Sequence, residues 1–343
     1  MIITRTPLRV SFLGGGSDYP SYFNEEAGAV LGTAINLYVF IALIQQTTLA
    51  DHPYKLTYRE FEAVESPSEL RHPVVRAVLE DARWQGPGLH IATLSDVPAN
   101  TGLGSSSAFT VAFIHALALL RERTVTAESL AREAIRIERD VLAEAGGWQD
   151  QFHAAYGGTA LYEFSSGAVT RRCPETAALA DGLNRAMVLV PSGRPRASHS
   201  HAAATHAAVK SGSGASAARE MADLARSTFA QLHKIDDSEI AVKLLADAMN
   251  GAWKLKQHVM RGDMDPDVQG LISKGRANGA LAGRLCGAGG SGFVLFLTDQ
   301  GDQQAFLDRA GFTQGGRVEV SDAGSVHGPT EWMQSPTLMP VGA

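Results

Sequence analysis

Apolar residues in the first half of the chain follow two alternating periodicities. Short runs rich in β-branched and aromatic residues indicate strands, and stretches with apolar positions three and four residues apart indicate helices. The predicted strands are residues 2–12, 30–44, 89–94, 158–164 and 185–191. The predicted helices are residues 68–84, 102–121 and 126–145. This alternation is typical of an α/β domain, which we place at residues 1–190.

The second half has longer helical stretches and fewer strands. Its predicted helices are residues 197–209, 216–233, 238–262, 266–280 and 301–311. A Ser-Gly break at 211–214 is expected to be a mobile loop. Two strands are predicted on either side of a glycine-rich turn at 287–292, and a third at 315–321. The pattern indicates an α+β domain over residues 191–325 and a loose tail at 326–343.

Length and composition agree with two domains that share a cleft. The chain has 343 residues, more than one hydrophobic core usually organises. A formal net charge of -6 and the absence of long Lys/Arg runs argue against nucleic acid as a partner. No apolar run reaches the roughly 18 residues of a membrane span and no signal-like N-terminus is evident, so no membrane partner is expected. With only Cys173 and Cys286, a cytoplasmic location is expected.

The most informative segment is the stretch from Pro98 to Ala108, which is rich in glycine and serine. Gly102 and Gly104 allow the backbone to approach an anion, and the helix that follows directs its free N–H groups toward the same place. A polyphosphate is the expected ligand. The candidate nucleotide-binding residues are Pro98, Asn100, Thr101, Gly102, Leu103, Gly104, Ser105, Ser106 and Ser107.

Two well-known nucleotide motifs do not match this loop. A Walker-type loop needs Gly-Lys-Ser/Thr, and the chain has no lysine between Lys55 and Lys210. The dinucleotide fingerprint Gly-x-Gly-x-x-Gly is excluded because Ser107 occupies its third glycine position. Taken alone, the segment could still be a turn that only caps a helix.

Three glycine-rich segments occur in order along the chain. They are Gly14-Gly-Gly-Ser-Asp-Tyr19, the loop at 98–108, and Gly287-Ala-Gly-Gly-Ser-Gly292. In this order and spacing they resemble the three motifs of the GHMP kinases, the superfamily of galactokinase, homoserine kinase and mevalonate kinase. Gly146-Gly-Trp-Gln-Asp-Gln-Phe152 and Trp253-Lys-Leu-Lys256 resemble the D-glycero-D-manno-heptose 7-phosphate kinases within it. The similarity runs from about residue 3 to about residue 320.

The resemblance implies a two-lobed α+β fold. An N-terminal α/β lobe would bind ATP, and the C-terminal lobe would be a ferredoxin-like α+β unit. ATP and Mg²⁺ are the expected cofactors. Magnesium takes few oxygen ligands from protein, and Ser106 and Glu138 are the candidates. On a helical wheel Glu133 flanks the other side of the same apolar stripe, so the pattern leaves the choice open and the resemblance favours Glu138.

Catalytic roles follow from the same resemblance. Asp150 occupies the position of the acid that receives or orients the acceptor hydroxyl. Arg9 matches a basic residue that lies near this acid and the γ-phosphate in several relatives. Arginine cannot act as a base, so Arg9 is expected to hold Asp150 ionised and to stabilise the transferred charge.

Acceptor binding is assigned to two further segments. Asp18 resembles the sugar-binding aspartate of galactokinases, but Gly15-Gly16 replaces their Glu-His, which argues against galactose. Arg194 and Arg196 are expected to bind a phosphate on the acceptor, and Lys254 and Lys256 are weaker candidates for this role. The candidate substrate residues are Gly15, Gly16, Ser17, Asp18, Arg194, Arg196, Gly289 and Gly290.

These features predict ATP-dependent phosphorylation of the anomeric hydroxyl of D-glycero-D-manno-heptose 7-phosphate, which gives the 1,7-bisphosphate for nucleotide-activated heptose synthesis. The expected partners are this sugar phosphate and ATP, and a homo-oligomer is left open. An L-fucose-type or other sugar 1-kinase would share nearly every residue except a use for Arg194 and Arg196. A non-catalytic sugar and ATP sensor is disfavoured because Ser106, Glu138 and Asp150 are all present. A decarboxylase similar to the mevalonate diphosphate enzymes is disfavoured by the acceptor loop.

Overall fold

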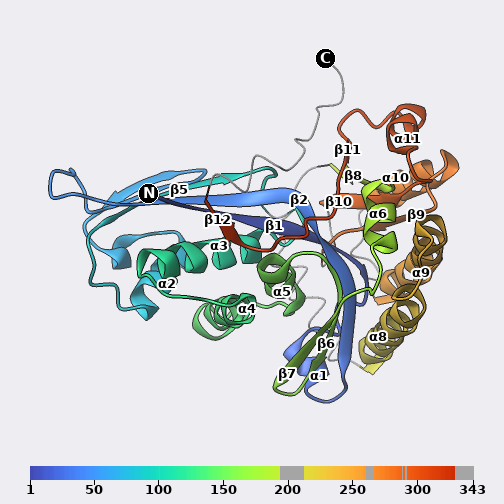
Figure 1. Ribbon diagram of the computed structural model, residues 1–343, viewed down its shortest axis with the longest axis horizontal. Helices are drawn as coiled ribbons and strands as arrows, with labels where there is room; N and C mark the ends of the chain where they lie inside the picture. The colour runs from blue at the N-terminus through green and yellow to red at the C-terminus, as the bar shows by residue number, and fades with distance from the viewer. Residues whose placement is uncertain (100, 194–211, 260–265, 288, 290–291, 329–343) are drawn as a thin grey trace.

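The computed structural model describes residues 1–99, 101–193, 212–259, 266–287, 289 and 292–328 (Figure 1). These residues form two β-sheets with helices packed against them. The predicted two-lobed α+β architecture is confirmed. Over the described residues, no helix is both long and apolar enough to cross a membrane.

Two long antiparallel strands organise the first sheet. β1 (Ile2–Leu13) pairs along its length with β2 (Gly28–Gln45), which pairs with β6 near its start and with β5 near its end. The strand order is β12-β1-β2-β5-β3-β4, and β7 pairs with β6. The remaining strands of this sheet are β3 (Tyr54–Thr57), β4 (Phe61–Val64), β5 (Leu89–Ser95), β6 (Thr159–Ser165), β7 (Ala168–Arg172) and β12 (Val326–His327).

One helix lies at the centre of the N-terminal lobe. α3 (Ser105–Leu120) packs against β1 and β2 on one side, and against α4 (Ala127–Arg136) and α5 (Gln149–Tyr156) on the other (Figure 1). A helix that is apolar almost all round is stable only when it is enclosed in this way. The other helical segments of this lobe are α1 (Pro20–Phe23), η1 (Pro67–Glu69), α2 (Pro73–Asp81) and η2 (Ile137–Val141).

The second sheet has the strand order β11-β8-β10-β9. Its strands are β8 (Met187–Pro191), β9 (Ala282–Leu285), β10 (Phe293–Leu297) and β11 (Gly316–Arg317). Its helices are α6 (Ala178–Asn184), α8 (Gly212–Leu232), α9 (Ser238–Val259), α10 (Pro266–Ala277) and α11 (Gln303–Ala310). α8 and α9 pack against each other and also contact β1 and β2, so one hydrophobic core continues from the first lobe into the second.

The boundary predicted at residue 190 is wrong for one strand. β8 was expected to close the first domain, but it pairs with β10 and β11 in the second sheet. Its residues from Met187 to Val190 are all buried, so the sequence pattern could not show which sheet it joins. The chain also returns to the first sheet after β11, because Val326 and His327 pair with β1 rather than forming the start of a loose tail.

Other predicted boundaries differ by shorter stretches. The helix expected at 68–84 is divided into η1 and α2, because Pro73 begins a new helix and cannot donate to the preceding turn. α8 already begins at Gly212, inside the expected Ser-Gly break. Thr126 caps α4 as its sequence indicates, by accepting a hydrogen bond from the Ser129 amide. The helix expected at 197–209 lies outside the described residues.

Candidate active site

The predicted phosphate-binding loop leads through a left-handed glycine into α3. Gly104 has φ 76° and stands at the N-cap of α3, and Gly102 has φ 78°. A Cβ added to Gly102 would lie 2.6 Å from the carbonyl oxygen of Cys286, which belongs to the second lobe. Glycine is therefore required at Gly102 both for its conformation and for this contact. The loop leads directly into the free N–H groups of α3, as an anion site requires.

Residues of the predicted nucleotide site differ in exposure. Thr101, Leu103 and Ser107 are buried, whereas Ser106 is exposed on the first turn of α3. Asn100, Arg194, Arg196 and Gly290 lie outside the described residues. Ser105 is the first residue of α3. The remaining predicted site residues, which are Gly15, Gly16, Ser17, Pro98 and Gly289, lie in the loops where the sequence places them.

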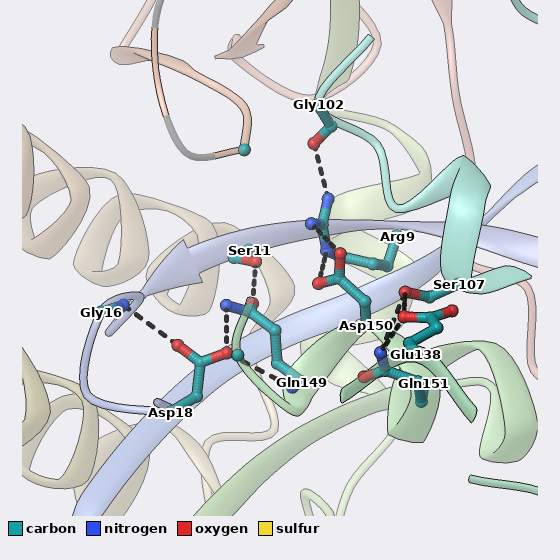
Figure 2. A network of polar contacts seen from close by, with 12 residues as sticks. Arg9, Ser11, Gly16, Asp18, Gly102, Ser107, Glu138, Gln149, Asp150 and Gln151 are labelled. Atoms are coloured by element: carbon teal, nitrogen blue, oxygen red, sulfur yellow. Dashed lines mark hydrogen bonds and ion pairs between the residues drawn. The ribbon is translucent and has the colours of Figure 1, made fainter. Parts of the chain in front are cut away.

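Arg9 and Asp150 form a two-pronged ion pair beside this loop (Figure 2). Arg9 Nε donates to Asp150 Oδ1 and Nη2 donates to Oδ2, each at 2.7 Å. Arg9 Nη1 donates to the carbonyl oxygen of Gly102 at 2.6 Å. The pair lies against Gly104, since a Cβ there would be 3.4 Å from Asp150 Oδ2. β1, the phosphate loop and α5 thus converge on one carboxylate.

Glu138 is enclosed behind the first turn of α3. Its Oε2 accepts hydrogen bonds from Ser107 Oγ at 3.0 Å and from Gln151 Nε2 at 2.6 Å (Figure 2). Arg139 Nη2 lies 3.4 Å from the same oxygen. Glu138 Oε1 is buried without a hydrogen-bond partner among the described residues. Burial raises the pKa of this carboxyl, and the Arg139 charge opposes that change.

The structure distinguishes Glu133 from Glu138, between which the helical wheel could not choose. Glu133 pairs with Arg136 at 2.7 Å and its side chain is 41% exposed, whereas Glu138 is 1% exposed and faces Ser107. Glu138 lies in a π turn, η2, which follows α4. A π turn adds a residue and changes the phase of a helix, so a wheel with a constant period misplaces the side chains beyond it. The structure also joins Glu138 to Ser107, not to the predicted Ser106.

Asp18 is buried beneath the start of α5. Its Oδ1 accepts from the Gly16 amide at 3.0 Å, and its Oδ2 accepts from Gln149 Nε2 at 3.0 Å (Figure 2). Burial raises the pKa of Asp18, and the nearby Asp150 charge raises it further, while the hydrogen bonds from Gln149 act in the opposite direction. Gly147 packs directly on the carboxylate, where any Cβ would collide with it.

Consecutive residues of α5 connect these groups. Gln149 holds Asp18 and also accepts from Ser11 Oγ, Asp150 pairs with Arg9, and Gln151 holds Glu138. Sequence reasoning gave the two glutamines no role, and it listed Ser107 as a nucleotide-binding residue and not as a partner of Glu138. The signal in the sequence was the run of three polar residues at the start of a helix. Polar side chains are rarely buried unless each one has a hydrogen-bond partner, so this run indicated three partners.

The chemistry of the Glu138 group fits magnesium. A buried carboxylate oxygen without a partner lies beside a serine hydroxyl, and magnesium favours such hard oxygen ligands. Among the described residues, no group of three or more His, Cys, Asp or Glu side chains could hold a metal. Magnesium usually takes one or two ligands from the protein and completes its shell with phosphates and water.

A glycine-rich loop at a helix start, a carboxylate paired with an arginine and a buried carboxylate beside a serine hydroxyl are the kinds of group that phosphoryl transfer requires. Comparison with known proteins agrees. Residues 70–158 match the GHMP kinases N terminal domain, and residues 229–313 match the GHMP kinases C terminal domain. The chain belongs to the GHMP kinases and is an ATP-dependent sugar kinase.

Individual proteins that are similar to this chain are sugar kinases by name. The chain is 26% identical over 317 residues to a D-glycero-alpha-D-manno-heptose 7-phosphate kinase of Campylobacter jejuni, a match that covers 87% of this chain and 89% of the relative. It is 28% identical over 322 residues to a bifunctional fucokinase/GDP-fucose pyrophosphorylase of Arabidopsis thaliana, with coverage of 87% of this chain and 30% of the relative. A crystal structure of a D-glycero-D-manno-heptose 1-phosphate kinase from Bacteroides thetaiotaomicron has the same fold, with TM-score 0.76, 21% identity and coverage of 96% and 99% of the two chains.

Replacing Glu138 with Gln should raise the free Mg²⁺ concentration needed for half-maximal activity. Loss of an outer-shell partner lowers metal affinity at least about tenfold. Loss of a direct ligand should therefore raise the required Mg²⁺ concentration by at least that factor. Activity titrated against free Mg²⁺ measures the shift. Glu133→Gln is the matched control, because its carboxylate lies on the surface. Ser106→Ala should show a shift as well, and an unchanged requirement there would leave Ser107 as the only serine candidate.

Asp150→Asn should reduce kcat by about 10² to 10⁴ while the dissociation constant for ATP stays close to that of the unchanged protein. The reason is that the carboxylate acts on the acceptor hydroxyl and not on the nucleotide. Asp140→Asn removes an exposed carboxylate of η2 and serves as the control. A variant at Asp150 that keeps more than about a tenth of the turnover would remove this residue from catalysis.

Proposed function

We propose that this kinase transfers the γ-phosphoryl group of ATP to the anomeric hydroxyl of D-glycero-D-manno-heptose 7-phosphate and releases the 1,7-bisphosphate and ADP. The observation that supports the transfer step most directly is the ion pair of Arg9 and Asp150 beside the phosphate loop. The sugar is inferred from the heptose 7-phosphate kinase that matches nearly the whole chain.

The transfer needs one proton to leave the acceptor. As the new O–P bond forms and the bond from the γ-phosphorus to the β-phosphate oxygen breaks, the hydroxyl proton passes to Asp150. Each carboxylate oxygen accepts one hydrogen bond from Arg9 and retains a lone pair for the hydroxyl. Arg9 holds the carboxylate in place and adds positive charge where negative charge develops.

Three other groups would position the reactants. The free N–H groups at the start of α3 would bind the phosphates of ATP. Ser106, Ser107 and Glu138 are the residues that would hold magnesium, which would offset phosphate charge when bound. Asp18, fixed by Gly16 and Gln149, would accept hydrogen bonds from sugar hydroxyls. Arg194 and Arg196 remain predicted ligands of the acceptor phosphate.

An L-fucose-type sugar 1-kinase is the second candidate. It is favoured by the similarity to the fucokinase part of a longer plant protein. The two functions share Arg9, Asp150 and Asp18, and they differ in whether the acceptor already carries a phosphate.

A panel of sugars and sugar phosphates should separate these candidates. Heptose 7-phosphate should give the highest kcat/KM, and free heptose and L-fucose should be poorer by at least an order of magnitude, since they lack a charge-assisted contact. ADP release measures turnover, and phosphorus NMR of the product should show a new phosphate at the anomeric carbon. Preference for a free sugar over its terminal phosphate would contradict the heptose 7-phosphate assignment and support the second candidate.

A further inference from the structure

Two cations, of which one is buried and one is half-buried, lie on the second lobe where it meets β1. Arg284 on β9 is 5% exposed and donates from Nη1 to the carbonyl oxygen of Phe12. Its Nε is buried and has no hydrogen-bond partner among the described residues. Lys256 on α9 donates from Nζ to the carbonyl oxygen of Gly287 at 2.6 Å, and more weakly to that of Leu285 at 3.4 Å.

In the part of the chain that the structure describes, neither cation forms an ion pair with a carboxylate. The charged or titratable groups that face them are Arg9 on β1 and the thiol of Cys286. Burial and the neighbouring Arg284 charge lower the pKa of Lys256 to about 7, and burial lowers that of Arg284 to about 10. Burial raises the pKa of the Cys286 thiol, which is therefore neutral at pH 7 and supplies no counter-charge.

An unpaired cation that is wholly or partly withdrawn from water costs free energy, and two adjacent ones cost more because they repel each other. Asp150 is already shared with Arg9 in a two-pronged pair. Departures from charge pairing of this kind are concentrated at functional sites. The missing counter-charge is therefore expected to come from a ligand.

The position of the two cations restricts which ligands could reach them. Gly287, which Lys256 contacts, packs against Gly102 of the phosphate loop. Arg284 contacts Phe12, just before the acceptor loop that begins at Gly14. The ammonium of Lys256 has three donors, and the two carbonyl contacts leave one for an anion. The cations thus lie between the segments that would bind the phosphate donor and the acceptor.

We propose that Lys256 binds a phosphate oxygen in the active site and that Arg284, next to it, strengthens the positive potential there. The phosphate is either the one carried by the acceptor or the γ-phosphate of ATP. The inference rests on the proposed function for the first source only, because ATP brings its γ-phosphate whichever sugar is the acceptor.

Steady-state kinetics of Lys256→Met distinguish the two sources. If the site binds the acceptor phosphate, KM for heptose 7-phosphate should rise roughly 10- to 100-fold, with KM for ATP and activity on a free sugar unchanged. If it binds the γ-phosphate, KM for ATP should rise or kcat should fall equally for all acceptors. The control is Lys243→Met on the same helix, whose lysine pairs with Glu239 on the surface.

The pH profile provides a second test that a purely structural role would not affect. Lys256 binds an anion only when protonated, so the affected KM should rise as the pH increases above about 7. In Lys256→Arg the charge persists, and the same KM should stay flat over that range. This variant also keeps the proposal testable if Lys256→Met does not fold.

Binding of inorganic phosphate, read as an increase in the thermal unfolding temperature, should be weaker in Lys256→Met than in Lys243→Met. Kinetic constants and phosphate binding equal to those of Lys243→Met, together with a pH profile unchanged in Lys256→Arg, would overturn the proposal. The kinetic results would differ from these if the proposed function were wrong. The enzyme would then prefer free sugars, and the effect of Lys256→Met would appear with ATP alone.

Discussion

The first turn of α5 is the element on which the rest of the site depends. Gln149, Asp150 and Gln151 hold Asp18, Arg9 and Glu138, which belong to the acceptor loop, β1 and the π turn after α4. Successive residues of a helix point about 100° apart, so three neighbours can serve three directions at once. A shift of this turn would move the acceptor, proton-transfer and metal groups together.

Close backbone contacts align the two lobes around that turn. Gly102 and Gly287 lie so near each other that a Cβ on Gly287 would come within 2.6 Å of the Gly102 Cα. The Thr101 carbonyl also accepts from the Phe293 amide of β10 at 3.2 Å. The phosphate loop is therefore held by the second lobe as well as the first, and the glycines of two distant motifs are explained by a single contact.

The sequence allowed the fold class, the glycine-rich loop before α3 and the proximity of Arg9 to Asp150 to be predicted, because glycine spacing and motifs shared with a family are local signals. The helical pattern by itself could not select Glu138 over Glu133, because the π turn breaks the period on which a helical wheel relies. Gln149 and Gln151 have no periodic signal and gain meaning only from their partners in space. β8 could not be assigned to its sheet, because apolar residues on both faces fit either lobe.

The most direct test of this account is a kinetic comparison of Gln149→Ala with Gln151→Ala, in which KM for the acceptor and the Mg²⁺ requirement are measured in both variants. Gln149→Ala should raise KM for the acceptor about tenfold with little change in the Mg²⁺ requirement, because Gln149 donates to Asp18 and makes no hydrogen bond to Glu138 or Ser107. Gln151→Ala should raise the Mg²⁺ requirement roughly 10- to 100-fold with little change in that KM, because Gln151 donates to Glu138 and to Ser107, which are both candidate magnesium ligands. If both variants change the same constant, or if they lower only thermal stability, the central role of α5 is contradicted.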